Sequence, residues 1–196
     1  MQKLILASSS SYRRELLSRL GFAFDWVSPQ IDETPHSNEQ PEQLAMRLAQ
    51  TKAQSVAGKF PDSLIIGSDQ VAVIGDEKIG KPGNYQNAVA ILSRASGKMM
   101  NFHTAVCVLN TATGRIHCEV DQFSVRFRPL DEQTIVNYIT REQPYNCAGA
   151  FRSEGLGITL LDSMHGDDPT ALIGLPLIRL IRMLEQEGIN VLLDGD

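Results

Sequence analysis

Residues 4–17 read Leu-Ile-Leu-Ala-Ser-Ser-Ser-Ser-Tyr-Arg-Arg-Glu-Leu-Leu, and this stretch indicates how the chain folds. Its first four residues are apolar with no polar alternation, which is typical of a strand buried on both faces. Leu16, Leu17 and Leu20 have helical spacing, so a helix is expected over residues 13–20. The four serines between these elements therefore form a loop at a helix N-terminus.

A loop in that position is suited to binding an anion. The first amide groups of a helix and the positive end of its dipole attract negative charge, and hydroxyl groups such as those of Ser8 and Ser10 add hydrogen-bond donors. The alternative is that Ser10 or Ser11 only caps the helix while Arg13 and Arg14 lie in solvent. Four serines together with two arginines favour a phosphate site over that alternative.

Composition and charge narrow the class of protein. The chain has 196 residues and a net charge of -5, whereas a broad nucleic-acid surface is usually basic. No apolar run approaches the roughly 20 residues of a membrane span, and no signal peptide is recognised, so a cytoplasmic protein is expected. Cys107, Cys118 and Cys147 are widely spaced and are expected to be reduced thiols.

The order of the apolar patterns predicts the fold class. Strands are expected at residues 22–27, 64–74, 102–109, 116–127 and 158–161, and helices at 40–59, 87–96, 131–142 and 177–187. Asp167 and Asp168 are expected to be solvated. Alternation of strands and helices followed by a hairpin indicates an α/β protein with a mixed central sheet flanked by helices. Residues 1–196 are expected to form one domain of two lobes around a cleft.

Asp69 is the carboxylate that most invites a functional interpretation. It stands in an expected strand between two apolar runs, where a carboxylate rarely lies without a partner or a task. Capping of a turn at the end of the strand is the structural alternative. We favour a functional role.

Two glycine-rich stretches need separate interpretations. Residues 75–82, Gly-Asp-Glu-Lys-Ile-Gly-Lys-Pro, match most of a Walker A loop, but Pro82 stands where that loop needs the Ser or Thr that binds magnesium. A turn is therefore expected instead of a Walker A loop. Residues 148–157 contain three glycines and predict a loop that another strand or a ligand approaches closely.

Several of these motifs together resemble the Maf family of nucleotide pyrophosphatases. They include the serine loop, Asp32-Glu33-Thr34, Gly80-Lys81-Pro82 and Ile173-Gly174-Leu175-Pro176. The resemblance implies a Maf/ITPase-like fold with a nucleotide-binding cleft. Most members carry Ser-Pro-Arg-Arg where this chain has Ser11-Tyr12-Arg13-Arg14. That variant resembles the branch that acts on 7-methyl-GTP rather than the branch that acts on dTTP and UTP.

The resemblance also implies roles for individual residues. Asp69 would be the general base, and Glu33 and Asp69 would hold a divalent metal cation, Mg²⁺ or Mn²⁺. By residue type alone, Asp32 and Glu33 are more simply solvated, and Lys52 would extend its amino group to water. The residues expected to bind the phosphates are Ser8, Ser10, Arg13, Lys52 and Lys81. Those expected to choose the base are Tyr12, Gln70 and Glu154.

The expected activity is hydrolysis of 7-methyl-GTP to 7-methyl-GMP and pyrophosphate, which would remove modified nucleotides before they enter RNA. A nucleoside triphosphate is then the partner, with no nucleic acid or membrane, and a homodimer is allowed. Three alternatives stay open: a dTTP/UTP pyrophosphatase of the same family, a non-catalytic nucleotide sensor that regulates cell division, and a phosphohydrolase that releases orthophosphate.

Overall fold

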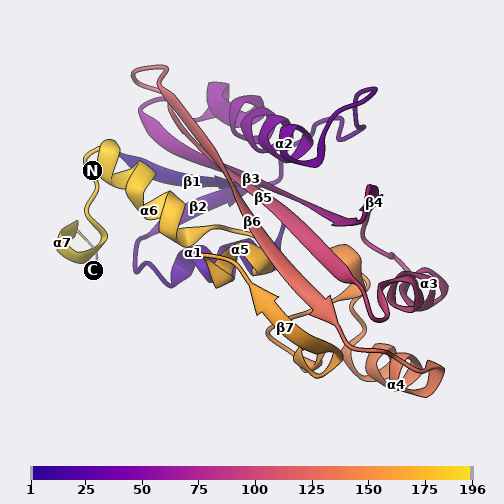
Figure 1. Ribbon diagram of the computed structural model, residues 1–196. Coiled ribbons are helices and arrows are strands. Elements are labelled where there is room, and N and C mark those ends of the chain that lie inside the picture. Colours follow the sequence, from indigo (N-terminus) through magenta and orange to yellow (C-terminus); the bar gives the residue numbers. More distant parts are fainter. Residues whose placement is uncertain (1, 195–196) are drawn as a thin grey trace. The chain divides into compact units, whose positions relative to one another are not determined.

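The computed structural model describes residues 2–194, and it confirms a mixed α/β fold with a seven-stranded central sheet flanked by helices (Figure 1). The strands are β1 (Lys3–Ala7), β2 (Phe24–Val27), β3 (Ser63–Ile74), β4 (Glu77–Ile79), β5 (Met99–Asn110), β6 (Ile116–Phe127) and β7 (Leu161–His165). The α-helices are α1 (Ser11–Ser18), α2 (Pro41–Val56), α3 (Tyr85–Ala95), α4 (Glu132–Glu142), α5 (Pro169–Ile173), α6 (Leu177–Gln186) and α7 (Val191–Asp194). Short 3₁₀ helices cover Ala57–Lys59, Ala148–Ala150 and Leu156–Leu160.

The sheet has the strand order β2-β1-β3-β5-β6-β7, and β4 pairs with β3. Strand β1 is parallel to both β2 and β3, with Ala7 beside Gly67. The β3–β4 and β6–β7 pairs are antiparallel. The sheet is therefore mixed, as the sequence predicts.

The chain divides into two compact units that share these strands. The first unit comprises residues 1–69, 104–121 and 168–196, and the second comprises residues 70–103 and 122–167. Strands β3, β5 and β6 each pass from one unit into the other. The expectation of one domain over residues 1–196 stays a prediction.

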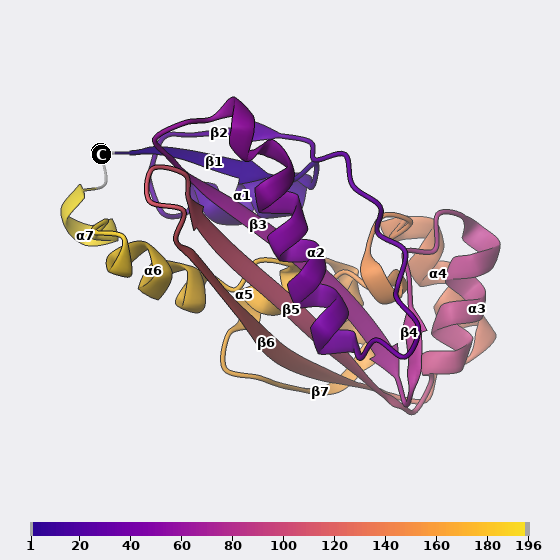
Figure 2. The same ribbon diagram turned by 90° about the horizontal axis from the view of Figure 1, so that it is seen from above.

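The core of the first unit explains why its strands lack polar alternation. Leu4, Leu6, Leu64 and Ile66 belong to one buried cluster together with the leucines of α1 and α6. The intervening residues, Ile5, Ala7 and Ile65, belong to another cluster with Ala53 and Val56 of α2. Side chains alternate across a strand, so α2 covers one face of this part of the sheet while α1 and α6 cover the other (Figures 1 and 2). Both faces are apolar because both are covered.

The second unit has its own core. Phe151 packs against Phe102 and Phe127, with ring centroids 6.5 and 5.6 Å away. Gly149 has a φ of +70° and lies so close to Met100 that an added Cβ would be 2.5 Å from its sulfur. The glycine-rich stretch predicted as a loop thus consists of a loop over residues 151–155 between two short 3₁₀ helices.

The structure corrects four expectations from the sequence. Residues 158–161 are mainly a 3₁₀ turn, and the strand starts at Leu161. Part of the turn expected after β3 forms β4. Asp168 is buried rather than solvated, because its carboxylate accepts hydrogen bonds from Thr170 and from the Ile178 amide and so fixes the starts of α5 and α6. Cys107 and Cys118 form a disulfide, since the β5–β6 hairpin places their Cα atoms 4.2 Å apart.

None of the helices in the described part of the chain is long and apolar enough to cross a membrane.

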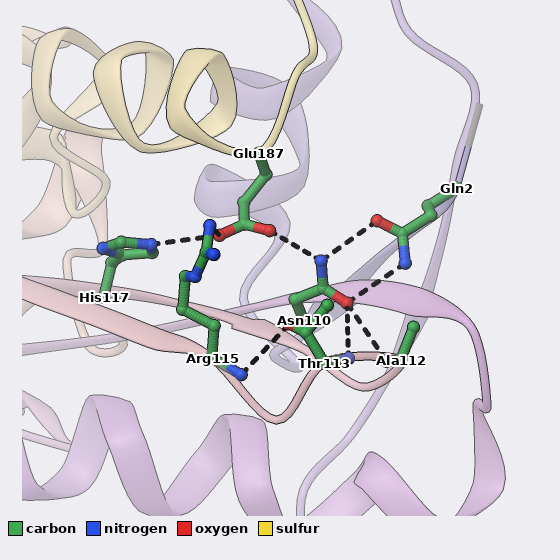
Figure 3. A network of polar contacts seen from close by, with 7 residues as sticks. All are labelled: Gln2, Asn110, Ala112, Thr113, Arg115, His117 and Glu187. Carbon is green, nitrogen blue, oxygen red and sulfur yellow. Dashed lines mark hydrogen bonds and ion pairs between the residues drawn. The ribbon is translucent and has the colours of Figure 1, made fainter.

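A polar network joins the β5–β6 hairpin to the end of α6 (Figure 3). The nearly buried Glu187 carboxylate accepts a 2.6 Å hydrogen bond from Asn110 and lies 3.0 Å from His117 Nε2 and 3.5 Å from Arg115 Nη1. Gln2 exchanges two hydrogen bonds with the Asn110 side chain. Burial raises the pKa of Glu187, but the hydrogen bonds and the charges outweigh burial, and the pKa is lowered overall.

We predict that Glu187→Gln lowers the free energy of unfolding by about 1.5–3 kcal/mol near neutral pH, the range for hydrogen bonds to a charged group. A folded-state pKa below the unfolded value means that the ionised carboxylate stabilises the fold above the unfolded pKa. That contribution disappears as pH falls through the folded pKa, so the variant and the wild type should converge in acid. Urea denaturation across this pH range measures the difference. Glu185→Gln, at an exposed position in the last turn of α6, should have no such effect.

Candidate active site

A buried lysine lies between two carboxylates in the first unit. Lys52 Nζ is 2.5 Å from Asp69 Oδ1 and 2.7 Å from Glu33 Oε1. The side chains of Lys52 and Asp69 are 8% and 11% exposed, whereas that of Glu33 is 59% exposed. The structure therefore brings together three residues that lie far apart in the sequence, and Lys52 does not extend into solvent.

Gly67 lets helix α2 reach the strand that carries Asp69. A Cβ atom added at Gly67 would lie 2.1 Å from the backbone oxygen of Ala49 and 3.1 Å from the Cβ of Ala53, both in α2. Gly67 and Asp69 are two residues apart in β3, so both face α2. The missing side chain thus brings the backbones of helix and strand close enough for Lys52 to contact Asp69.

The opposite face of β3 carries a second part of the site. Ser68 donates a 3.0 Å hydrogen bond to the carbonyl oxygen of Gly174, and Arg13 Nε donates a 2.8 Å hydrogen bond to the same oxygen. Gly174 ends α5 with φ 132° and ψ 7°, a backbone conformation suited to glycine. Its carbonyl group therefore holds Arg13 and the residue next to Asp69 in a fixed relation.

The charge of Arg13 is affected by its surroundings. Burial lowers the pKa of its guanidinium below the ordinary value, and the negative charges of Asp69 and Glu33 oppose that shift. Guanidinium groups stay protonated in proteins, so Arg13 is a cation near both carboxylates. Such a group is suited to binding phosphate oxygens.

The two arginines of the opening motif have different surroundings. Arg14 does not contact Gly174 but stacks on Trp26 of β2, with its guanidinium carbon 4.1 Å from the ring centroid. Ser8 is buried at the end of β1, and its hydroxyl accepts a hydrogen bond from the Ser10 amide. The Ser10 hydroxyl in turn accepts from the Arg13 amide and caps α1. Ser10 therefore performs the capping role that the sequence left open, and its hydroxyl hydrogen still leaves it a donor.

The carboxylates of Glu33 and Asp69 fit a hard divalent cation. Both approach one cationic nitrogen, so two oxygen donors already converge on a single point. Within residues 2–194, no group of three or more His, Cys, Asp and Glu side chains gathers as a metal cage. Mg²⁺ is commonly held by one or two carboxylates, with water and substrate phosphates completing its shell. The donor set agrees with that mode of binding.

The remaining predicted site residues belong to different surroundings. Tyr12 is half-buried in the first turn of α1. Gln70 follows Asp69 in β3 and begins the second unit. Lys81 lies in the second unit just after β4 and lines a groove with Lys78 and Arg94. In the same unit, Glu154 pairs with Arg152 at 3.4 Å and accepts a hydrogen bond from Ser153.

Residues that the sequence did not single out complete the first-unit site. Ser68 lies in the strand expected at residues 64–74, and Gly174 lies in the Ile173–Pro176 motif. No pattern assigns a task to a small polar residue in a strand or to a backbone carbonyl group. Arg47 in α2 forms an ion pair with Glu39, close to Glu33 along the chain. Its place in the helix gives no indication of that partner.

We predict that Gly67→Ala lowers the free energy of unfolding by about 1–3 kcal/mol, the usual cost of forcing extra volume into a packed interior. The added methyl group would meet backbone atoms of α2, which cannot turn away as a flexible side chain can. Chemical denaturation measures the loss. Gly58→Ala is the matched control in the same unit, because nothing lies within 4 Å of a Cβ at that position. Equal stability of the two variants would contradict the close approach.

Comparison with known proteins identifies the same protein family as the sequence motifs. The sequence profile described as Maf-like protein matches residues 3–187. A 7-methyl-GTP pyrophosphatase from Nitrosococcus oceani is 56% identical over 189 residues, which cover 96% of this chain and 95% of that protein.

Two solved structures are similar to the chain at a lower level. The Ham1 protein of Staphylococcus aureus has a TM-score of 0.46 and 10% identity, and the match covers 64% of this chain and 72% of that chain. A HAM1 protein of Coxiella burnetii has a TM-score of 0.43 and 12% identity, with coverages of 65% and 73%. Likeness at this level identifies neither a site nor an activity.

Proposed function

This chain belongs to the Maf-like protein family, and from that premise we propose that it hydrolyses 7-methyl-GTP to 7-methyl-GMP and pyrophosphate. Identity of 56% with a 7-methyl-GTP pyrophosphatase, over nearly the full length of both chains, is the observation that carries the choice of substrate. The contacts of Lys52 with Glu33 and Asp69 support the choice of reaction, because they bring together a cation for a polyphosphate and carboxylates for a metal and a water molecule. Arg13 adds a second cation, whose charge interacts with both carboxylates.

In the proposed reaction, a water oxygen forms a bond to the α-phosphorus while the bond from that phosphorus to the bridging oxygen of the β-phosphate breaks. Asp69 accepts the proton of the water, and pyrophosphate leaves. The residues proposed to bind phosphate oxygens are Ser8, Ser10, Arg13, Lys52 and Lys81. Positioned cations of this kind stabilise the charge that develops on phosphoryl oxygens.

A divalent cation, when bound, would neutralise phosphate charge and orient the reacting groups. Glu33 and Asp69 are the residues that would hold it. Lys52 contacts both carboxylates in the structure, and we propose that it exchanges Glu33, the more exposed of the two, for a phosphate oxygen when the nucleotide binds.

Tyr12, Gln70 and Glu154 are proposed to choose the base. The N7-methylated guanine ring is cationic, and a cation is favoured by stacking on an aromatic ring and by a nearby carboxylate. Arg152 neutralises part of the charge of Glu154 in the structure, which limits the size of the effect. Location in the cytoplasm, assembly as a homodimer and removal of modified nucleotides before RNA synthesis stay predictions.

The first test is a product assay with purified protein, Mg²⁺ or Mn²⁺, and 7-methyl-GTP, GTP, UTP and dTTP. We expect pyrophosphate, with kcat/KM for 7-methyl-GTP at least about tenfold above the others, the order of discrimination that pocket contacts supply. Preference for dTTP or UTP would place the chain in the other branch of the family. Orthophosphate as the product would indicate a phosphohydrolase. No turnover of any nucleotide would favour a sensor.

The same assay tests the base. Asp69→Asn keeps the shape of the side chain but removes its ability to accept the proton of water, so kcat should fall by about 10²–10⁴-fold while binding of 7-methyl-GTP changes far less. Asp25→Asn is the control, because Asp25 is an exposed carboxylate of the same unit that pairs with Lys3. Near-normal turnover by Asp69→Asn would refute the assignment.

Base choice is tested by Glu154→Gln. We expect the preference for 7-methyl-GTP over GTP to fall by about fivefold, in keeping with a partly exposed charge interaction of about 1 kcal/mol. Ratios of kcat/KM measured by direct competition of the two nucleotides give the preference. Glu132→Gln, at an exposed position of the second unit, should leave it unchanged. An unaltered preference in Glu154→Gln would exclude this residue from base choice.

A further inference from the structure

Glu33 lies on a segment with no regular secondary structure. Residues 28–40 connect β2 to α2 without helix or strand, and the Glu33 side chain is mostly exposed. Its contact with Lys52 is the ion pair that bridges this carboxylate to the buried part of the site. A mobile loop would place a metal ligand poorly, because ligands act only when other contacts hold them in position.

The same segment is tied to α2 at a second point. Arg47 donates from Nε to Glu39 Oε1 at 2.6 Å and from Nη2 to Glu39 Oε2 at 2.9 Å. This is a bidentate ion pair, and the Glu39 side chain is only 8% exposed. Glu39 also accepts a hydrogen bond from the His36 amide. Paired hydrogen bonds between a guanidinium and a carboxylate fix geometry as well as adding energy.

Arg47 also reaches the residue directly after Glu33. Its Nη2 donates a 3.1 Å hydrogen bond to the Thr34 carbonyl oxygen, and the Thr34 amide donates a 2.9 Å hydrogen bond to Asp32. The peptide units on either side of Thr34 are therefore held, one by α2 through Arg47 and the other by a turn within the loop. Arg47 and Lys52 are in one helix, so a single rigid element supports both the loop and the phosphate-binding lysine.

The second tie gains importance when the substrate binds. This step rests on the function proposed above: if Lys52 exchanges Glu33 for a phosphate oxygen, Glu33 loses that contact at the moment when it is needed to bind the cation. We propose that Arg47 and Glu39 form a clamp that positions Glu33 once its contact with Lys52 is broken. Arg47 is thus a positioning residue, since its contacts are with Glu39 and the Thr34 carbonyl oxygen and it acts through the loop.

The clamp stays ionised under the conditions in which the reaction would run. The hydrogen bond from Arg47 is the main cause that lowers the pKa of Glu39 to about 2. Both groups therefore remain charged at neutral pH, and the clamp requires no proton to be gained or lost as the substrate binds.

The clamp is tested with Arg47→Met and two readouts that do not depend on turnover. The first is hydrogen exchange of residues 30–38 in the metal-free protein, which should become faster as the loop loosens. The second is Mn²⁺ binding in the presence of inorganic pyrophosphate, followed by electron paramagnetic resonance. Its Kd should rise by about tenfold, the lower end of the losses seen when a group supporting a metal ligand is removed.

Four further variants distinguish the clamp from a simple loss of positive charge. Arg19→Met removes an exposed arginine that pairs with Glu15 on the same unit, and it should change neither readout. Arg47→Lys keeps the positive charge but cannot form the bidentate ion pair, so an effect between those of the wild type and Arg47→Met is expected. Glu39→Gln should resemble Arg47→Met, and the double variant should be no worse than either, because the two residues act as one unit.

Unchanged exchange in Arg47→Met would overturn the clamp. Faster exchange with an unchanged Kd for Mn²⁺ would also overturn it, because the loop would then be held for stability and not for the metal. Absence of Mn²⁺ binding by the wild-type protein in the presence of pyrophosphate would contradict the role of Glu33 itself. Failure of the proposed function would appear separately, as absence of turnover in the product assay while these binding and exchange differences persist.

Discussion

The close packing of helix α2 on strand β3 at Gly67 is the constraint on which the site of the first unit depends. A side chain at this position would meet the backbone of Ala49, so only glycine allows the helix axis to lie this near the strand. A lysine side chain has a fixed reach, and at a greater separation Lys52 would not meet Asp69. Arg47 lies on the same helix, so the position of the Glu33 loop follows from the same packing contact.

Because side chains alternate along β3, neighbouring residues of the site lie on opposite faces of the sheet. Asp69 points to the face covered by α2, where it meets Lys52, and Ser68 points to the other face, where it meets the Gly174 carbonyl group. Arg13 uses that same carbonyl group. Gly174 is placed by α5, which Asp168 caps and Thr104 holds through the Ala171 carbonyl oxygen. The hydrogen bonds to the Gly174 carbonyl oxygen on one face of the sheet thus orient Arg13, while Asp69 lies on the other face.

How far the sequence predicts this arrangement depends on the range of each interaction. The strand, serine loop and helix of residues 4–17 follow from local periodicity, and β6 begins and ends where the apolar pattern does. The buried environment of Asp69 also follows from its apolar neighbours. Contacts such as Lys52 with Glu33, or Arg47 with Glu39, join surface-like charges whose partners are chosen by tertiary packing. The burial of Asp168 and the pairing of Cys107 with Cys118 likewise depend on elements folding back on one another.

The choice of cation at each position agrees with the task proposed for it. Arginine presents a planar fork that matches a carboxylate at two points, and Arg47 uses it to hold a contact that must persist. Lysine carries a compact charge on a flexible stem, so it can exchange one oxygen partner for another without a fixed orientation. Lys52 occupies the place where such an exchange is required, between two carboxylates that a metal cation would also bind. An arginine at that position would hold the carboxylates too firmly in its fork to release them, whereas a lysine at position 47 would hold the loop less firmly than arginine does. The site thus combines an ion pair that persists, Arg47–Glu39, with one that can be exchanged, Lys52–Glu33. In the proposed order of binding, the Lys52–Glu33 pair breaks while the Arg47–Glu39 pair holds the loop.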